Sequence, residues 1–264
     1  MKKKLLITMG CSFTEGIGCW DISTFPKNFS TQSPSFYSIK ELNKPNFHRN
    51  GWPNRLGKKL GYDKVINLGL GGSSTSGQVK QFFEKYIDKD FAEYDVLLVW
   101  LLTDPSRISF YKNDKIVNLM SNPQYDKNYI FDGYVKFLSN SSNFNKDLLN
   151  EQIFYRKIMK TVCELKSYNF ITFHINHEFN DLIKNIISND DASHAYIALD
   201  DTKEELRKLL ISQICNHWNE AGYELVSTNM FNWIISNHPN LVETPKDSID
   251  WEWDGEPLNN LIED

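Results

Sequence analysis

Short apolar runs alternate along this chain with stretches in which apolar residues recur at helical spacing. The apolar runs predict strands over residues 4–9, 64–68, 94–102, 170–175 and 223–226. Helical spacing predicts helices over residues 52–60, 76–88, 153–165 and from 206 to about 222, with Ser74 or Thr75 as the cap of the second. Strands that alternate with helices are typical of a three-layer α/β fold, in which helices cover both faces of a mostly parallel sheet.

Two long segments interrupt this pattern, at about 20–49 and 105–148. They are polar and weakly patterned, so we interpret them as insertions in a single domain of residues 1–264. An acidic tail, 243–264, contains Trp251 and Trp253 and is expected to dock in part. Loops this long are usually functional or contain small elements. Their aromatic residues suit either sugar stacking or packing of the loops on themselves; they are Trp20, Trp52, Tyr111, Tyr125, Tyr129 and Tyr134.

Composition narrows the class of protein. Hydrophobic residues make up 41% of the 264 residues, enough for a large core, and the net charge of −5 argues against nucleic acid as a partner. No apolar run approaches the roughly 18 residues of a membrane span, and the run after Lys4 is too short for a signal peptide. The four cysteines form no CxxC pair, so we expect reduced thiols and a cytoplasmic protein without a metal or cofactor.

Candidate chemistry lies in two glycine-rich turns. The first strand runs directly into Gly10-Cys11-Ser12, and the second runs into the turn from Asn67 to Ser73. Open α/β sheets bind their ligands at the carboxyl ends of the strands. We therefore expect a Ser12 nucleophile and an oxyanion site at one sheet edge, although Ser12 could instead cap the next helix.

In these motifs the chain resembles the SGNH (GDSL-like) hydrolases. The Gly-x-Ser block of that family reads Gly10-Cys11-Ser12, and Asn67 to Gly72 matches its second block. The third block normally reads Gly-x-Asn-Asp; here the asparagine is absent, and Thr103 or Asp104 stands near its place. The fourth block normally reads Asp-x-x-His-Pro-Asn; here His238-Pro239-Asn240 is kept, but Ile235 replaces the aspartate.

The resemblance implies a flavodoxin-like sheet and hydrolysis of an ester through an acyl-enzyme. Ser12 would attack, and His238 would act as its base. The backbone N–H groups of Ser12 and Gly72 would hold the oxyanion, together with the Thr103 hydroxyl. Because the aspartate is missing, a backbone carbonyl or another aspartate, such as Asp247 or Asp250, would have to orient the histidine.

Other polar residues follow the third and fourth strands. Asp104, Arg107 and His177 are expected to bind substrate, because the fork of Arg107 suits a carboxylate and His177 lies at the same sheet edge. Arg107 could equally pair on the surface with an acidic neighbour. His174 is interpreted as a satisfied histidine within the sheet. A metal site formed by His174, His177 and Asp181 has no recognised ligand spacing.

These features predict a hydrolase that acts on a small-molecule or glycan ester, with an O-acetylated carbohydrate as the expected substrate. Two other classes stay open. The altered third and fourth blocks would suit a carbohydrate- or partner-binding module that has lost catalysis. A nucleotide-binding protein would also place glycine turns after strands, but neither turn reads G-x-G-x-x-G, and no Walker A lysine follows. The sequence does not indicate an oligomeric state.

Overall fold

The computed structural model describes residues 2–16, 48–105, 107–112, 115–119, 144–175, 192–197, 208–209 and 217–255. Six strands form one sheet in the order β7-β6-β3-β1-β2-β8, and all five neighbouring pairs are parallel. These strands are β1 (Lys3–Met9), β2 (Lys64–Asn67), β3 (Tyr94–Leu101), β6 (Asn169–His174), β7 (His194–Tyr196) and β8 (Asp250–Trp253). The predicted mostly parallel sheet is confirmed.

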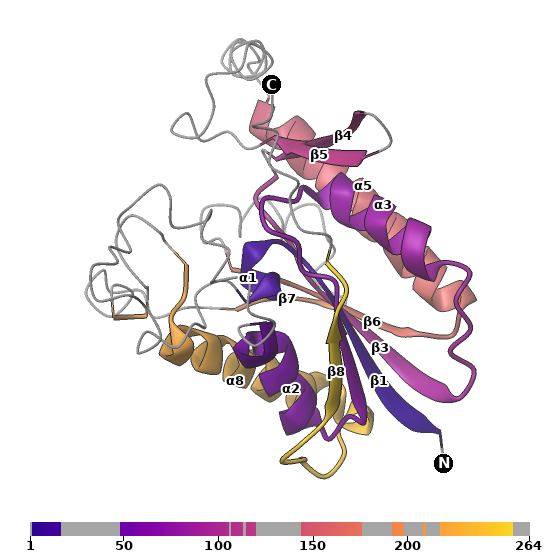
Figure 1. Cartoon of the computed structure of the whole chain (residues 1–264), viewed down its shortest axis with the longest axis vertical. Coiled ribbons are helices and arrows are strands. Elements are labelled where there is room, and N and C mark those ends of the chain that lie inside the picture. Colours follow the sequence, from indigo (N-terminus) through magenta and orange to yellow (C-terminus); the bar gives the residue numbers. More distant parts are fainter. Residues whose placement is uncertain are drawn as a thin grey trace.

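Helices cover both faces of this sheet, as Figure 1 shows. The helices are α1 (Ser12–Glu15), α2 (Trp52–Leu60), α3 (Thr75–Tyr86), α5 (Phe144–Leu165) and α8 (Glu220–Asn237), with short 3-10 turns η4 (His48–Asn50) and η6 (Pro239–Leu241). α2 and α8 pack on one face, and α3 and α5 pack on the other. None of the described helices is long and apolar enough to cross a membrane.

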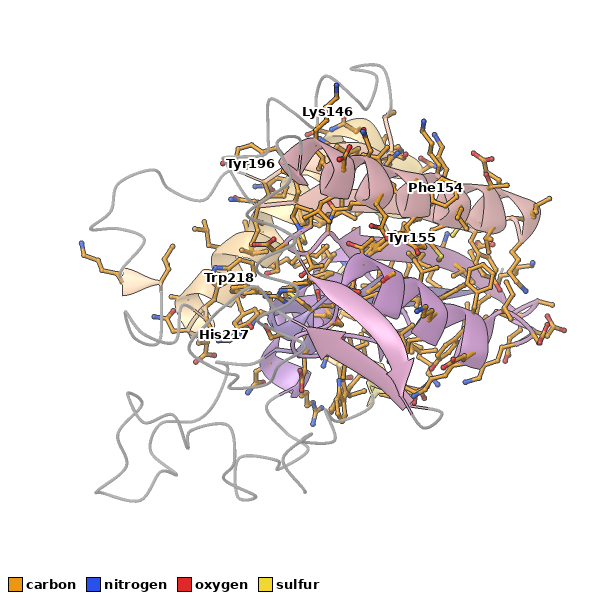
Figure 2. All side chains as sticks on the ribbon, turned by 90° about the horizontal axis from the view of Figure 1, so that it is seen from above. Lys146, Phe154, Tyr155, Tyr196, His217 and Trp218 are labelled. Carbon is orange, nitrogen blue, oxygen red and sulfur yellow. The ribbon has the colours of Figure 1, made fainter. Side chains whose placement is uncertain are left out.

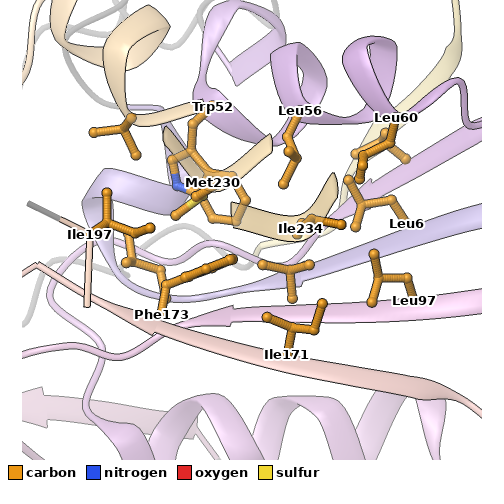
Figure 3. Packing of buried hydrophobic residues seen from close by; sticks show 14 of the residues in the cluster. Leu6, Trp52, Leu56, Leu60, Leu97, Ile171, Phe173, Ile197, Met230 and Ile234 are labelled. Atoms are coloured by element: carbon orange, nitrogen blue, oxygen red, sulfur yellow. The ribbon is translucent and has the colours of Figure 1, made fainter. Parts of the chain in front are cut away.

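The pleat of the strands divides the core into two clusters. Leu6 of β1 belongs to the cluster under α2 and α8, whereas its neighbours Leu5 and Ile7 belong to the cluster under α3 and α5. Figure 3 shows the first cluster, in which side chains of the two helices meet those of β1, β3 and β6. Because both faces of the central strand β3 are covered, residues 96–101 are all buried, as the apolar run predicted.

The predicted strand over 223–226 is wrong, because these residues lie inside helix α8. Tyr223, Val226, Met230 and Ile234 are fully buried and recur every three or four residues, which is the period of a helix. A short apolar run does not by itself distinguish a buried strand from a buried helix. The two outer strands of the sheet are instead β7 and β8, and β8 comes from the acidic tail.

The insertion predicted at 105–148 contains an antiparallel hairpin, β4 (Ile108–Lys112) and β5 (Lys115–Leu119), and its last residues belong to α5. Helix α5 begins at Phe144 rather than at residue 153. Residues 17–47, which hold nearly all of the other predicted insertion, lie outside the described residues. Trp52, a candidate for sugar stacking, is buried in the core under α2.

Candidate active site

Ser12 lies at the carboxyl end of β1, where the chain turns sharply into α1. Gly10 makes this turn possible, because its φ is +154° and a Cβ there would lie 1.9 Å from Thr14 Oγ1. Helix α1 is a single turn that begins at Ser12, and the Gly16 N–H closes it on the Ser12 carbonyl at 3.1 Å. The Ser12 side chain is only 6% exposed.

His217 is the imidazole that contacts Ser12. Its Nε2 lies 2.8 Å from Ser12 Oγ, which is hydrogen-bonding distance. Phe13 packs beside this pair, with its ring centroid 5.1 Å from that of His217 and 4.5 Å from that of Trp218. Figure 2 shows His217 and Trp218 together just ahead of helix α8. A hydroxyl paired with an imidazole in this way is the arrangement of an activated nucleophile and its base.

The structure does not bring the expected histidine, His238, to Ser12. His217 precedes the first residue of α8, and His238 follows the last of its 18 residues. The helix therefore separates the two histidines by about 27 Å. His238 Nε2 lies 2.6 Å from the Ala192 carbonyl oxygen, and its ring packs on Trp233.

The second glycine-rich turn lies directly against the first. Leu70 N donates to the Gly10 carbonyl at 3.1 Å, and Gly71 N donates to Glu15 Oε2 at 2.6 Å. Gly72, a predicted oxyanion donor, is buried in this turn with φ +73°. The turns that carry Ser12 and Gly72 are thus held together, as the shared sheet edge predicted.

The carboxyl group of Glu15 joins the first turn to the second, and its pKa is unusually high. Burial raises the pKa of Glu15 from 4.5 to about 7, although the hydrogen bond from Gly71 N opposes this shift. The side chain points back from α1 to the second turn rather than to Ser12. Ionisation of Glu15 therefore affects the contact between the two turns and not the reacting groups themselves.

Thr103 follows β3, where the family pattern has an asparagine. Its carbonyl accepts a hydrogen bond from Gln152 Nε2 at 2.8 Å. The Thr103 side chain is 6% exposed, and its Oγ1 is buried with no hydrogen-bond partner among the described residues. A buried hydroxyl without a partner can still donate to a ligand.

A cavity of about 200 Å³ adjoins Thr103 and the two residues that flank Ser12 in the sequence. It is lined by Cys11, Phe13, Leu101, Leu102, Thr103, Asp104, Pro105, Arg107, Gln152, His174 and Ile175. Two of the three predicted substrate-binding residues, Asp104 and Arg107, are therefore brought to one cavity. The third, His177, lies outside the described residues.

His174 lines the cavity and also belongs to a buried hydrogen-bonded chain. Its Nδ1 lies 3.0 Å from His194 Nε2, and the two rings stack with centroids 4.9 Å apart. His194 Nδ1 in turn lies 2.7 Å from Thr172 Oγ1, which accepts from Arg156 Nε at 2.7 Å. His174 is thus bonded within the sheet through Nδ1, whereas its Nε2 is buried with no hydrogen-bond partner among the described residues.

The two aspartates considered as partners of the histidine lie near the amino ends of the strands, opposite the edge that carries Ser12. Asp250 pairs in register with Lys64, the first residue of β2, whereas Ser12 follows the last residue of β1. Asp247 is exposed and follows Lys246, which bonds Asp63 just ahead of β2. Neither aspartate reaches the Ser12–His217 pair.

No group of three side chains suited to hold a metal ion occurs among the described residues. The candidate set of His174, His177 and Asp181 is only partly described, since the last two residues fall within 176–191. The described part of the site therefore offers a hydroxyl, an imidazole and hydrogen-bond donors.

Comparison with known proteins agrees with this fold. No family model and no curated protein matches the sequence. Among solved structures, the lipase Lip_vut3 from goat rumen metagenome is similar, with TM-score 0.50 and 14% identity over 88% of this chain and 97% of that one. A protein assigned to the G-D-S-L lipolytic family from Desulfitobacterium hafniense DCB-2 aligns over 88% of this chain and 99% of its own, with 12% identity and TM-score 0.44. The chain therefore shares its α/β fold with the structure of the Lip_vut3 lipase.

His217 was not among the predicted site residues, because apolar spacing predicts a single helix from residue 206 to near Gly222. The structure instead begins a helix at Glu220, with Asn219 Oδ1 accepting from Gly222 N at 3.0 Å as the N-cap. Asn219 followed by Glu220 is a sequence signal for a helix start. This signal would have placed His217 in the connection before the helix.

Proposed function

We propose that this protein is a serine-dependent ester hydrolase in which Ser12 is the nucleophile and His217 is the general base. The observation that supports this proposal is the 2.8 Å contact between Ser12 Oγ and His217 Nε2 at the carboxyl edge of the sheet. In the tautomer that carries its proton on Nδ1, His217 Nε2 accepts the Ser12 proton. Ile235 replaces the aspartate expected three residues before His238. Because the proposed base is His217, this replacement does not affect it.

In the first half of the reaction, Ser12 Oγ attacks the ester carbonyl carbon while its proton passes to His217 Nε2. The tetrahedral intermediate then expels the alcohol oxygen, which takes that proton, and an acyl-serine forms. In the second half, water gives a proton to His217 and its oxygen attacks the acyl carbon. His217 returns the proton to Ser12 Oγ as the carboxylic acid leaves.

The negative oxygen of each intermediate needs donors. We assign the backbone N–H groups of Ser12 and Gly72 and the Thr103 hydroxyl to this role. The absence of a partner for Thr103 Oγ1 among the described residues supports the assignment. Loss of one such donor lowers the rate by on the order of 10²–10³.

The substrate is a short acyl ester. The long aromatic segments that suggested an O-acetylated carbohydrate lie largely outside the described residues, and Trp52 is buried. A glycan as the alcohol half of the ester is therefore a proposal from the sequence alone.

A fluorophosphonate probe tests the nucleophile and the base together. We expect labelling at Ser12, mapped by mass spectrometry, that disappears in Ser12→Ala and falls by at least about 10³ in His217→Ala. His238→Ala is the matched control, and it should label at the wild-type rate. Labelling that persists in His217→Ala refutes His217 as the base. A folded protein that does not label would instead favour a binding module without catalysis.

A further inference from the structure

The cavity lined by Cys11 and Phe13, the sequence neighbours of Ser12, combines a small volume with a histidine and an arginine whose Nη1 is buried. We propose that it is the acyl pocket and that it selects esters whose acyl group ends in a carboxylate. This inference rests on the proposed hydrolysis and specifies its substrate class. The expected substrate is then the half-ester of a short dicarboxylic acid, and not a simple acetyl ester.

The position of His217 indicates which half of the substrate enters the cavity. His217 returns its proton to the alcohol oxygen, so the alcohol half must lie on the His217 side of Ser12. His217 does not belong to the described residues that line the cavity, whereas Cys11 and Thr103 do. Phe13 lines the cavity and also packs on His217, so it lies between the two. The acyl half therefore occupies the cavity.

Arg107 supplies the positive charge of the pocket. Its Nη1 is buried and has no hydrogen-bond partner among the described residues. A buried guanidinium nitrogen without an acceptor is costly, and a carboxylate is the group that matches its planar fork. Asp104, the other charged lining residue, has an exposed side chain, so water and salt screen its charge. One guanidinium balances one carboxylate.

His174 adds a neutral hydrogen-bond donor. The chain of Thr172 and His194 can fix the proton of His174 on Nε2. When Thr172 donates to His194 Nδ1, His194 Nε2–H donates to His174 Nδ1, and His174 carries its own proton on Nε2. In the reverse arrangement, Thr172 donates to the Ser193 carbonyl at 3.2 Å, and both ring protons shift to Nδ1. Either arrangement keeps every bond between these side chains. An anion in the cavity selects the first one.

The volume of the cavity sets the length of the acyl group. A cavity of about 200 Å³ is smaller than the roughly 300–1,000 Å³ of common small-molecule sites, so it suits a short acyl group such as succinyl and not a long fatty acyl chain.

The test compares two 4-nitrophenyl esters of equal size, the hemisuccinate and the neutral 4-oxopentanoate, after subtraction of the spontaneous rate. We expect the wild type to favour the hemisuccinate at least about tenfold in kcat/KM. Arg107→Met should lower kcat/KM for the hemisuccinate about 10- to 100-fold and alter the neutral ester less than about threefold. Arg107→Lys should lie between them. An equal change for both esters, or a wild-type preference for the neutral one, overturns the proposal.

Binding to Ser12→Ala separates this inference from the proposed hydrolysis. Calorimetry with monomethyl succinate should show binding that Arg107→Met abolishes and His174→Phe weakens several-fold. If wild-type protein hydrolyses neither ester but this binding depends on Arg107, the hydrolase proposal fails and the carboxylate pocket stands. If the esters are hydrolysed but binding is absent or indifferent to Arg107, the pocket alone is refuted.

Discussion

The side-chain amide of Asn67 donates a hydrogen bond to the Thr14 carbonyl oxygen at 2.9 Å, across 53 residues of sequence. Asn67 Oδ1 also accepts from Gly69 N at 2.8 Å, and Asn67 is only 1% exposed. One buried amide therefore joins the turn that carries Ser12 to the turn that carries Gly72. The geometry of the candidate site depends on this connection as much as on its reacting groups.

Replacement of Asn67 by alanine should destabilise the protein, because it leaves the Thr14 carbonyl and the Gly69 N–H buried without partners. Each such group costs on the order of 1–3 kcal/mol of the free energy of unfolding, which urea denaturation measures. Asn237→Ala is the matched control, since its amide also donates to a backbone carbonyl, that of Trp233, but is exposed. We expect its effect to stay within about 0.5 kcal/mol. Equal effects of the two variants would contradict the connecting role of Asn67.

Glu15 should make the stability of the fold depend on pH. Because the folded-state pKa of Glu15 is raised to about 7 from 4.5, the unfolded chain ionises this group first. Its contribution to stability is complete below about pH 4.5 and is lost as pH rises through 7. The maximum loss is about 3 kcal/mol, from 1.36 kcal/mol for each pKa unit.

The neutral variant Glu15→Gln should lack this loss. Urea denaturation at pH 5 and pH 8 should show that the variant gains stability relative to the wild type at the higher pH. The lowered pKa of Asp63, set first by the hydrogen bond from Lys246, acts in the opposite direction, because its contribution is lost as pH falls. Asp63 is present in both proteins and cancels in the comparison. A constant difference between the two proteins at both pH values would disprove the buried-carboxyl explanation.

The sequence predicted those elements whose residues decide their own structure. The covered strand β3 is almost entirely apolar, and Ser74 caps α3 by accepting from Gly77 N at 3.0 Å, so local pattern was sufficient there. Ser12 and Gly72 were predicted to lie at one edge of the sheet because glycine-rich turns follow strands that are easily recognised.

The elements that were missed depend on distant contacts. Strand β7 has only three residues, and their pairing with β6 supplies the signal that the local sequence lacks. The apolar run 223–226 fits a strand or a helix, and only its packing against α2 and the sheet decides for α8. His217 was missed for the same reason, since its approach to Ser12 depends on where α8 begins.

Gly69→Ala should disrupt the junction between the two turns. A Cβ at Gly69 would lie 2.1 Å from Glu15 N and 2.4 Å from Thr14 C, and these backbone atoms have little freedom to move. We expect a loss of about 1–3 kcal/mol or more in the free energy of unfolding. Gly57→Ala is the comparison, because its Cβ would lie 2.4 Å from Val65 Cγ2, a side-chain atom and not backbone, so this variant should also lose stability but less than Gly69→Ala. A Gly69→Ala protein as stable as Gly57→Ala would argue against close packing at the site.

Trp253 should affect activity more than its distance along the chain from Ser12 suggests. Its Nε1 donates to the Gly69 carbonyl at 2.9 Å, so strand β8 holds the second glycine turn in place. Trp253→Phe deletes this bond and frees the turn, which should slow fluorophosphonate labelling of Ser12 several-fold with a loss of about 1 kcal/mol of stability. Trp251→Phe is the matched variant on the same strand, since Trp251 packs on the core under α2 and α8. It should lower the Tm without slowing the labelling of the folded protein. If both variants lower labelling in proportion to stability, Trp253 supports the fold and not the position of the turn.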